Sequence, residues 1–254
     1  MRSSVQPRLA LLHQRGPSAP VASTLAPEEA ARSGGRRVAA STSATCDHRA
    51  VTETVRVVLE HGARSVFAVA LDWPGWARRA TTPDAALATL ADYATRYRPV
   101  AGKGFPRGRP ELQVVGELDG GAMVDFGALA HPGPWDDEPL PAGEADRFAA
   151  LLERSWAAFD AVAAGAPAEL RKGPRGGGRD TAKVVDHVRH AEQGYSAKAG
   201  VRLPGSTPWP ERRAAVVAAI RAGAPGARWP ARYVAQRFTW HVLDHLWEIE
   251  DRSE

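Results

Sequence analysis

Apolar and polar residues alternate along two short stretches that follow residue 53. An alternation with a period of two is typical of β-strands that bury one face. Only a short turn at His61 and Gly62 separates the two stretches, so the pattern predicts a β-hairpin. The alternating apolar residues are Val55, Val57 and Leu59 in the first stretch and Phe67, Val69 and Leu71 in the second.

A helix and two further strands are predicted next along the chain. Thr82 is a good N-cap, Pro83 fits the first helical position, and Asp84 complements the positive end of the helix dipole. We expect this helix to end at Pro99, because proline rarely continues a helix. The two strands are expected over residues 112–118 and 122–126. Together these elements predict a small α+β domain.

Four stripes of apolar residues with helical spacing fill the C-terminal part of the chain. Apolar positions that recur every three or four residues are typical of amphipathic helices that pack together. We expect these helices over residues 144–164, 180–200, 210–222 and 230–251. Four such helices joined by loops predict an up-down four-helix bundle.

Two segments lack any such periodicity. Residues 1–50 are rich in Arg, Ser, Ala and Pro and cannot bury enough apolar surface to offset the entropy of ordering, so we expect a disordered tail. Residues 128–142 contain four prolines and are acidic, and we interpret them as a linker. The sequence thus predicts a two-domain α+β protein, with the α+β domain at 51–127 and the bundle at 143–254.

Charge and cysteine content exclude several classes of function. The net charge of +4 comes from residues 1–50, because residues 51–254 contain 26 basic and 26 acidic side chains. We therefore expect no nucleic-acid partner. Cys46 is the only cysteine, so no internal disulfide can form and a cytoplasmic location is expected. No apolar run approaches the roughly 18 residues of a membrane span, so no membrane partner is expected.

Three histidines lie on the apolar stripes of two predicted helices. His241 and His245 are four residues apart, which places them on one side of the last helix. His187 follows Val184 by three residues on the second helix and also faces inward. Burying imidazoles is costly unless each nitrogen has a partner, and a shared zinc, nickel or iron ion would be such a partner. Hydrogen bonds to backbone or carboxylate groups are the alternative, and spacing alone leaves both interpretations open.

The sequence around these histidines resembles the DinB-like family of metal-binding four-helix bundles. In residues 184–192, His187 is followed five residues later by Glu192, as around the family's first metal ligand. Residues 240–245 resemble the family's last helix, which provides two ligands spaced by four, and Leu246 stands where the family often has a further histidine. The resemblance implies one divalent metal ion, with the ligands His187, His241 and His245.

The same resemblance implies an activity. The DinB-like family includes S-transferases and isomerases that use low-molecular-weight thiols. We therefore expect a metal-dependent thiol S-transferase that acts on a small electrophile, with His190 or Asp244 assisting proton transfer. His190 lies one turn from His187, so a fourth metal ligand and an ordinary surface residue are its other interpretations.

Residues 53–100 resemble a HicB-like domain. Two strands, a turn containing Asp72, Pro74 and Gly75, a helix and a strand follow in the family's order, which implies a β-β-β-α-β fold. Trp76 stands where that family often has cysteine. The family includes antitoxin partners, so a protein-interaction or regulatory role is one alternative to catalysis, and non-catalytic metal or ligand sensing is another. A homodimer is left open for each of these functions.

Overall fold

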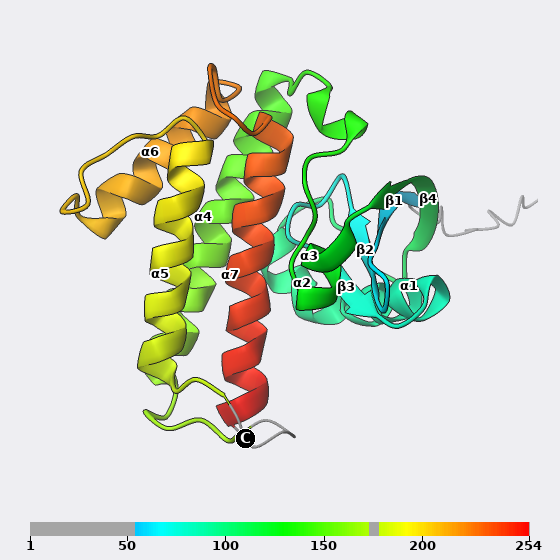
Figure 1. The fold of residues 1–254 in the computed structure, drawn as a ribbon, viewed down its shortest axis with the longest axis horizontal. Coiled ribbons are helices and arrows are strands. Elements are labelled where there is room, and N and C mark those ends of the chain that lie inside the picture. The colour runs from blue at the N-terminus through cyan, green and yellow to red at the C-terminus, as the bar shows by residue number, and fades with distance from the viewer. Residues whose placement is uncertain (1–53, 173–177, 254) are drawn as a thin grey trace, which may run out of the picture. The chain divides into compact units, whose positions relative to one another are not determined.

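A four-stranded sheet and seven α-helices make up the described part of the chain, residues 54–172 and 178–253 of a computed structural model (Figure 1). The mixed α+β class predicted from the sequence is therefore confirmed. The predicted tail at 1–50 lies outside the described residues. The elements are β1 Thr54–His61, β2 Val66–Ala70, β3 Ala77–Ala80, α1 Pro83–Asp92, α2 Ala94–Ala101, β4 Glu111–Asp119, α3 Gly121–Phe126, the 3-10 helix η1 Pro134–Asp137, α4 Ala142–Gly165, α5 Thr181–Lys198, α6 Trp209–Arg221 and α7 Ala231–Ser253.

The sheet has the strand order β3-β2-β1-β4. β1 pairs with β2 in the antiparallel sense, and Gly62 N donates to Ser65 O at 2.8 Å in the turn between them, which confirms the predicted hairpin. β1 also pairs with β4, in the parallel sense, because the chain crosses over through α1 and α2 before β4 begins. β4 is therefore an edge strand.

Both faces of β1 and β2 are covered, whereas the alternating pattern predicted one buried face. Val57 and Leu59 pack on the core formed with α1 and α2. Val58 and Val69 point to the other face, where they meet Leu129 and Trp240 in a second apolar cluster. All five residues of β2 are buried for this reason. The alternation was read correctly, but the second face is buried by parts of the chain that are far away in sequence.

The predicted helix start at Thr82 is confirmed, because the Thr82 hydroxyl accepts a hydrogen bond from Ala85 N at 3.3 Å. The helix does not run unbroken to Pro99, as predicted. It ends at Asp92, and α2 restarts at Ala94 and contains Pro99 within its last turn. The break lets α2 pack Tyr97 against Trp76, with ring centroids 5.7 Å apart in a stacked arrangement.

The strand predicted over residues 122–126 is wrong, because this segment forms the short helix α3. Gly121, the first residue of the helix, and Gly127, which follows its last residue, have positive φ angles of 54° and 100°, which glycine adopts without strain. The Asp125 carboxylate accepts backbone hydrogen bonds from Ala63 at 3.0 Å and Arg64 at 2.8 Å. α3 is therefore fixed by the hairpin turn, a contact that a five-residue pattern cannot reveal.

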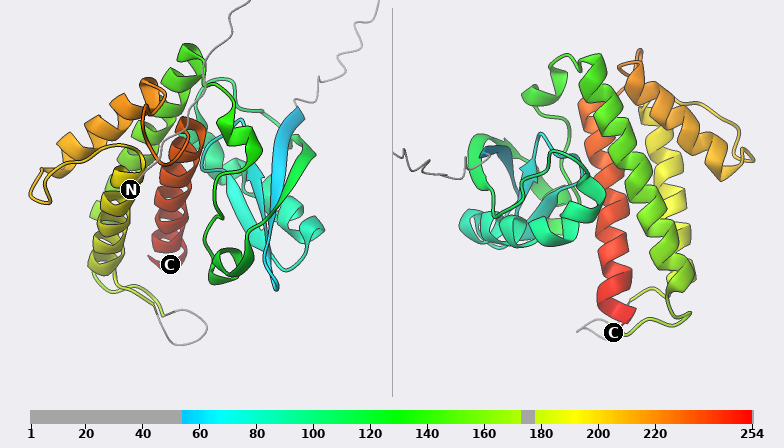
Figure 2. Two further views of the ribbon diagram at one scale, coloured as in Figure 1. Left: turned by 45° about the horizontal axis from the view of Figure 1, so that its top comes forward. Right: turned by 180° about the vertical axis from the view of Figure 1, so that it is seen from behind.

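The four C-terminal helices begin and end close to the predicted residues. α4, α5 and α7 run alongside one another, and α6 lies obliquely to them (Figures 1 and 2). α7 contacts each of the other three. In the described part of the chain no helix is long and apolar enough to cross a membrane. The predicted inward residues that are buried include Phe148, Leu152, Phe159, Val184, Val188, Ile220, Phe238 and Val242.

The segment predicted as a linker, 128–142, is buried over residues 128–130 and at Gly133 and Asp136, and is largely exposed over residues 137–142. Its first part inserts between the sheet and α7, where Tyr233 donates from its hydroxyl to Ala130 O and Arg237 donates from Nη1 to Leu129 O. On the sheet side, Ala130 N donates to Glu60 Oε2 at 2.7 Å. The described residues accordingly belong to one compact unit. Proline content indicated an irregular segment correctly but said nothing about its burial.

Candidate metal centre

The three histidines that the sequence singled out come together between α5 and α7. His187 lies in the second turn of α5, and His241 and His245 lie one turn apart on α7. Their ligand atoms all lie within 4.8 Å of one another, close enough to bind one metal ion. The prediction that these residues form a cluster is confirmed.

The spacing of the imidazole nitrogens suits a small divalent ion. Nε2 of His187 and Nε2 of His241 are 3.3 Å apart. Two nitrogens that bind one zinc ion tetrahedrally at about 2.0–2.1 Å are roughly 3.3–3.4 Å from each other. The three rings lie with centroids 4.6–5.1 Å apart, and their ligand atoms all lie within 4.8 Å of one another. The donor set therefore fits a zinc-like ion.

The alternative of ordinary, fully hydrogen-bonded histidines agrees less well with the contacts. His241 is buried, and its Nδ1 has no hydrogen-bond partner within residues 54–172 and 178–253. The one contact of its Nε2 is with His187, another imidazole. Neighbouring backbone and carboxylate groups thus do not account for the burial of this ring.

Two of the imidazoles are held in the neutral form that binds metals. Burial and the nearby His245 lower the pKa of His187 to about 4. Burial also lowers the pKa of His241 well below its ordinary value, and His245 and His187 add to the effect. Neutral imidazole keeps a lone pair on one nitrogen, so both rings are available as ligands near neutral pH.

Glu248 is a site residue that the sequence analysis missed. Its Oε2 lies 2.7 Å from Nδ1 of His245, and its Oε1 accepts a hydrogen bond from Arg252 Nη1 at 2.9 Å. This contact orients the His245 ring, whose ligand atom lies within 4.8 Å of those of His187 and His241. The spacing of three residues on one helix could have revealed the pair. An acid near a helix end is, however, normally solvated.

The two residues expected to assist proton transfer lie outside the cluster. His190 is exposed, and its Nδ1 lies 2.7 Å from the backbone oxygen of Asp186. Asp244 is partly exposed and accepts a hydrogen bond from Arg78 at 3.2 Å, so it joins α7 to β3. The geometry gives each of them another partner.

Glu192, the acid that resembles part of the family motif, belongs to the helical core. It is 1% exposed, and its Oε1 accepts a hydrogen bond from Trp156 Nε1 at 2.6 Å. Burial raises its pKa to about 7, although Arg213 Nε lies 3.7 Å from its Oε2. Glu192 therefore joins α5 to α4 and α6 rather than contributing to the histidine cluster.

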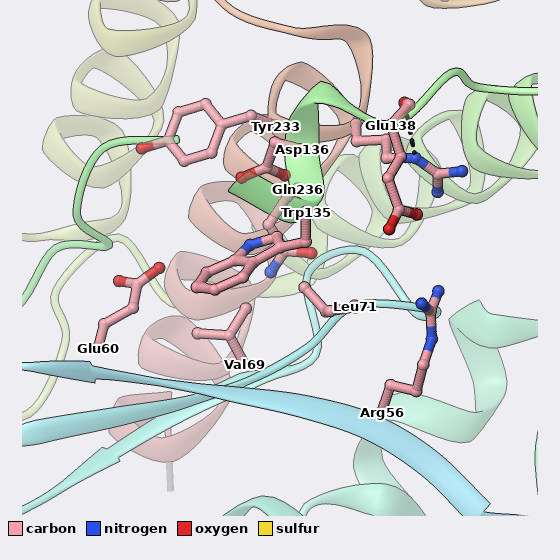
Figure 3. A pocket seen from close by; sticks show the side chains of 10 residues that line it. Arg56, Glu60, Val69, Leu71, Trp135, Asp136, Glu138, Tyr233 and Gln236 are labelled. Carbon is pink, nitrogen blue, oxygen red and sulfur yellow. Dashed lines mark hydrogen bonds between the residues drawn. The ribbon is translucent and has the colours of Figure 1, made fainter. Parts of the chain in front are cut away.

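A second polar site is a small cavity between the sheet and α7, about 20 Å³ in volume (Figure 3). Such a volume holds a water-sized molecule. Glu60 from β1 and Asp136 from η1 project toward it, and burial raises the pKa of Glu60 to about 7 and that of Asp136 to about 6. Each carboxylate accepts one backbone hydrogen bond, from Ala130 and Gly133 respectively. The bond between Ala130 N and Glu60 joins the start of the 128–142 segment to β1, whereas the bond between Gly133 N and Asp136 lies within the segment.

Comparisons with protein-family models, curated proteins and solved structures give no match for this chain. The DinB-like and HicB-like resemblances therefore stay predictions, and the function has to be argued from the histidine cluster itself.

Proposed function

We propose that this protein binds one divalent metal ion through His187, His241 and His245 and belongs to the DinB-like type of up-down four-helix bundle, with a HicB-like domain before it. The observation that carries the proposal is the convergence of three imidazole ligand atoms within 4.8 Å. Two of these imidazoles have lowered pKa values, and the third is oriented by Glu248. A purely structural core would not need this combination.

The chemistry proposed for the centre is a metal-dependent thiol S-transfer to a small electrophile. A divalent ion held by three neutral nitrogens supplies Lewis acidity and lowers the pKa of a thiol at a remaining coordination position. The contribution of the chain itself is to orient the histidine ligands and to keep water away from them. Glu248 fixes the His245 ring, and α7 buries His241 away from water.

A regulatory, protein-interaction role is the second candidate, and one observation favours it. β4 lies at the edge of the sheet and exposes Val114 and Val115, 38% and 45% of whose surfaces are accessible. An exposed apolar edge strand is a common docking site for an extended segment of a partner. In this role the histidine cluster would sense a metal rather than take part in catalysis.

The test is the metal content of the purified full chain, measured by mass spectrometry after incubation with zinc and removal of the excess. We expect about one ion per chain, as for one three-histidine site. His187→Ala, His241→Ala and His245→Ala should each lose most of it, because a remaining pair of imidazoles binds weakly. His190→Ala is the matched control and should keep full uptake. Equal uptake in all five proteins, or none in the unaltered chain, would refute the proposal.

A further inference from the structure

A buried arginine without a carboxylate partner lies one helical turn before the histidine cluster. Arg237 is 6% exposed and precedes His241 by four residues on α7, so both side chains leave the same side of the helix. Its Nη1 donates to the backbone oxygen of Leu129. Its Nε has no hydrogen-bond partner, and no carboxylate forms an ion pair with Arg237, in the part of the chain that the structure describes.

Two aromatic side chains connect Arg237 to the histidine cluster. The Tyr195 ring lies 5.5 Å from the His241 ring and 5.2 Å from the Arg237 guanidinium. The Trp240 ring lies 5.9 Å from His241 and 5.1 Å from the same guanidinium. Both rings thus contact the metal-ligand candidate and the arginine at once. The Tyr195 and Trp240 rings therefore line a single region that contains both Arg237 and His241.

A buried guanidinium keeps its charge at any physiological pH and presents a planar set of five donors. Leaving such a group without an anion is costly, and a carboxylate or phosphate matches its donors in a bidentate arrangement. The charge of Arg237 acts on the pKa of the buried Glu60 and lowers it, but the two side chains form no ion pair in the described residues, and Oε2 of Glu60 accepts a hydrogen bond from Ala130 N. An anionic group of a ligand would therefore provide the hydrogen-bond acceptor that Nε of Arg237 lacks in the described residues.

We infer that Arg237 anchors the anionic group of the ligand that binds at the histidine cluster, and that this ligand is a small thiol carrying a carboxylate. The inference rests on the proposed function, because the thiol sulfur is taken to bind at the metal ion. Arg237 and His241 leave α7 about 6 Å apart along the helix axis, a backbone spacing comparable to that of a thiol whose carboxylate is a few bonds from sulfur. Arg237 is then a specificity-determining residue.

The experiment uses the full chain loaded with Co²⁺, whose near-ultraviolet absorption reports thiolate binding. Mercaptopropionate is titrated against mercaptopropanol, a thiol of similar size without charge. We expect the acid to bind about tenfold more tightly or better, as for one desolvated charge-assisted contact. In Arg237→Gln this preference should fall close to one while Co²⁺ uptake persists. Arg189→Gln, which removes an exposed arginine from α5, should keep the preference.

Each result decides between distinct conclusions. A preference that persists in Arg237→Gln shows chelation of the ion by the ligand's own carboxylate and overturns the inference. A preference near one in the unaltered protein overturns it without any variant. If Arg237→Gln does not fold, Arg237→Met removes the charge from a side chain of similar length, and an undiminished preference there also overturns it. Failure to take up Co²⁺ refutes the proposed function, and the inference then falls with it.

Discussion

Replacement of Glu248 by glutamine tests whether the histidine cluster is built for a metal. In the structure, the Glu248 carboxylate lies 2.7 Å from His245 Nδ1 and is itself held by Arg252 at 2.9 Å. The hydrogen bond from His245 is the main reason why the pKa of Glu248 is lowered. Glu248→Gln removes the charge and keeps the shape. Loss of such an outer contact typically weakens metal binding about 10- to 100-fold, or about 1.4–2.7 kcal/mol.

The assay is a competition for Zn²⁺ between the protein and a chelator of known affinity. Glu250→Gln is the control, because Glu250 lies two residues further on and pairs with Arg96 at 2.7 Å. The control should match the unaltered chain. An unchanged dissociation constant in Glu248→Gln would refute the reasoning. So would an equal loss in both variants, because that result would reflect general charge instead of orientation of His245.

Three predictions concern the fold. The pKa of Glu192 is raised to about 7 in the folded chain from an ordinary value of 4.5, so as pH rises its carboxyl group loses its proton in the unfolded chain first. The contribution of this group to the stability of the fold is therefore lost as pH rises from about 4.5 to 7. We therefore expect urea unfolding to show that the difference in stability between Glu192→Gln and the unaltered chain changes by about 3 kcal/mol across that pH window, in favour of the variant at high pH. A difference that stays constant with pH would contradict this prediction. Gly75→Ala should cost about 3 kcal/mol, because Gly75 has φ +87° and an added Cβ would meet Thr239 at 2.5 Å. Gly194→Ala, in an open helical position, should instead stabilise by about 0.5–1 kcal/mol in thermal unfolding.

The helices and the histidine cluster were predictable because long amphipathic stripes fix the rotational phase of a helix. In α7 the buried stripe of Phe238, Val242 and Ile249 sets which way His241 and His245 face. In α5, Val184 and Val188 do the same for His187. Once both phases are known, only the pairing of the two helices is needed to bring the rings together, and a small bundle allows few pairings.

What the sequence could not show depends on contacts between distant segments. A strand that buries one face through Val57 and Leu59 would turn Val58 to solvent, yet Trp240 of α7 packs on that side of the sheet. The 122–126 segment was too short for its period to separate strand from helix, and Asp125 decides the outcome by holding the hairpin turn. The sequence places Glu248 three residues after His245. This spacing alone does not show which acids near the helix end contact a histidine and which are solvated.

α7 explains why the candidate metal centre can be rigid without a metal. Every residue from 233 to 243 is buried, because the sheet and the 128–130 segment cover one side of the helix while α4, α5 and α6 cover the rest. Side chains on such a helix have few alternative rotamers, so His241 is positioned by packing before any ion arrives. A zinc finger, by contrast, obtains its fold from the ion. Here the apolar core provides the fold, so the position of His241 does not depend on a metal ion.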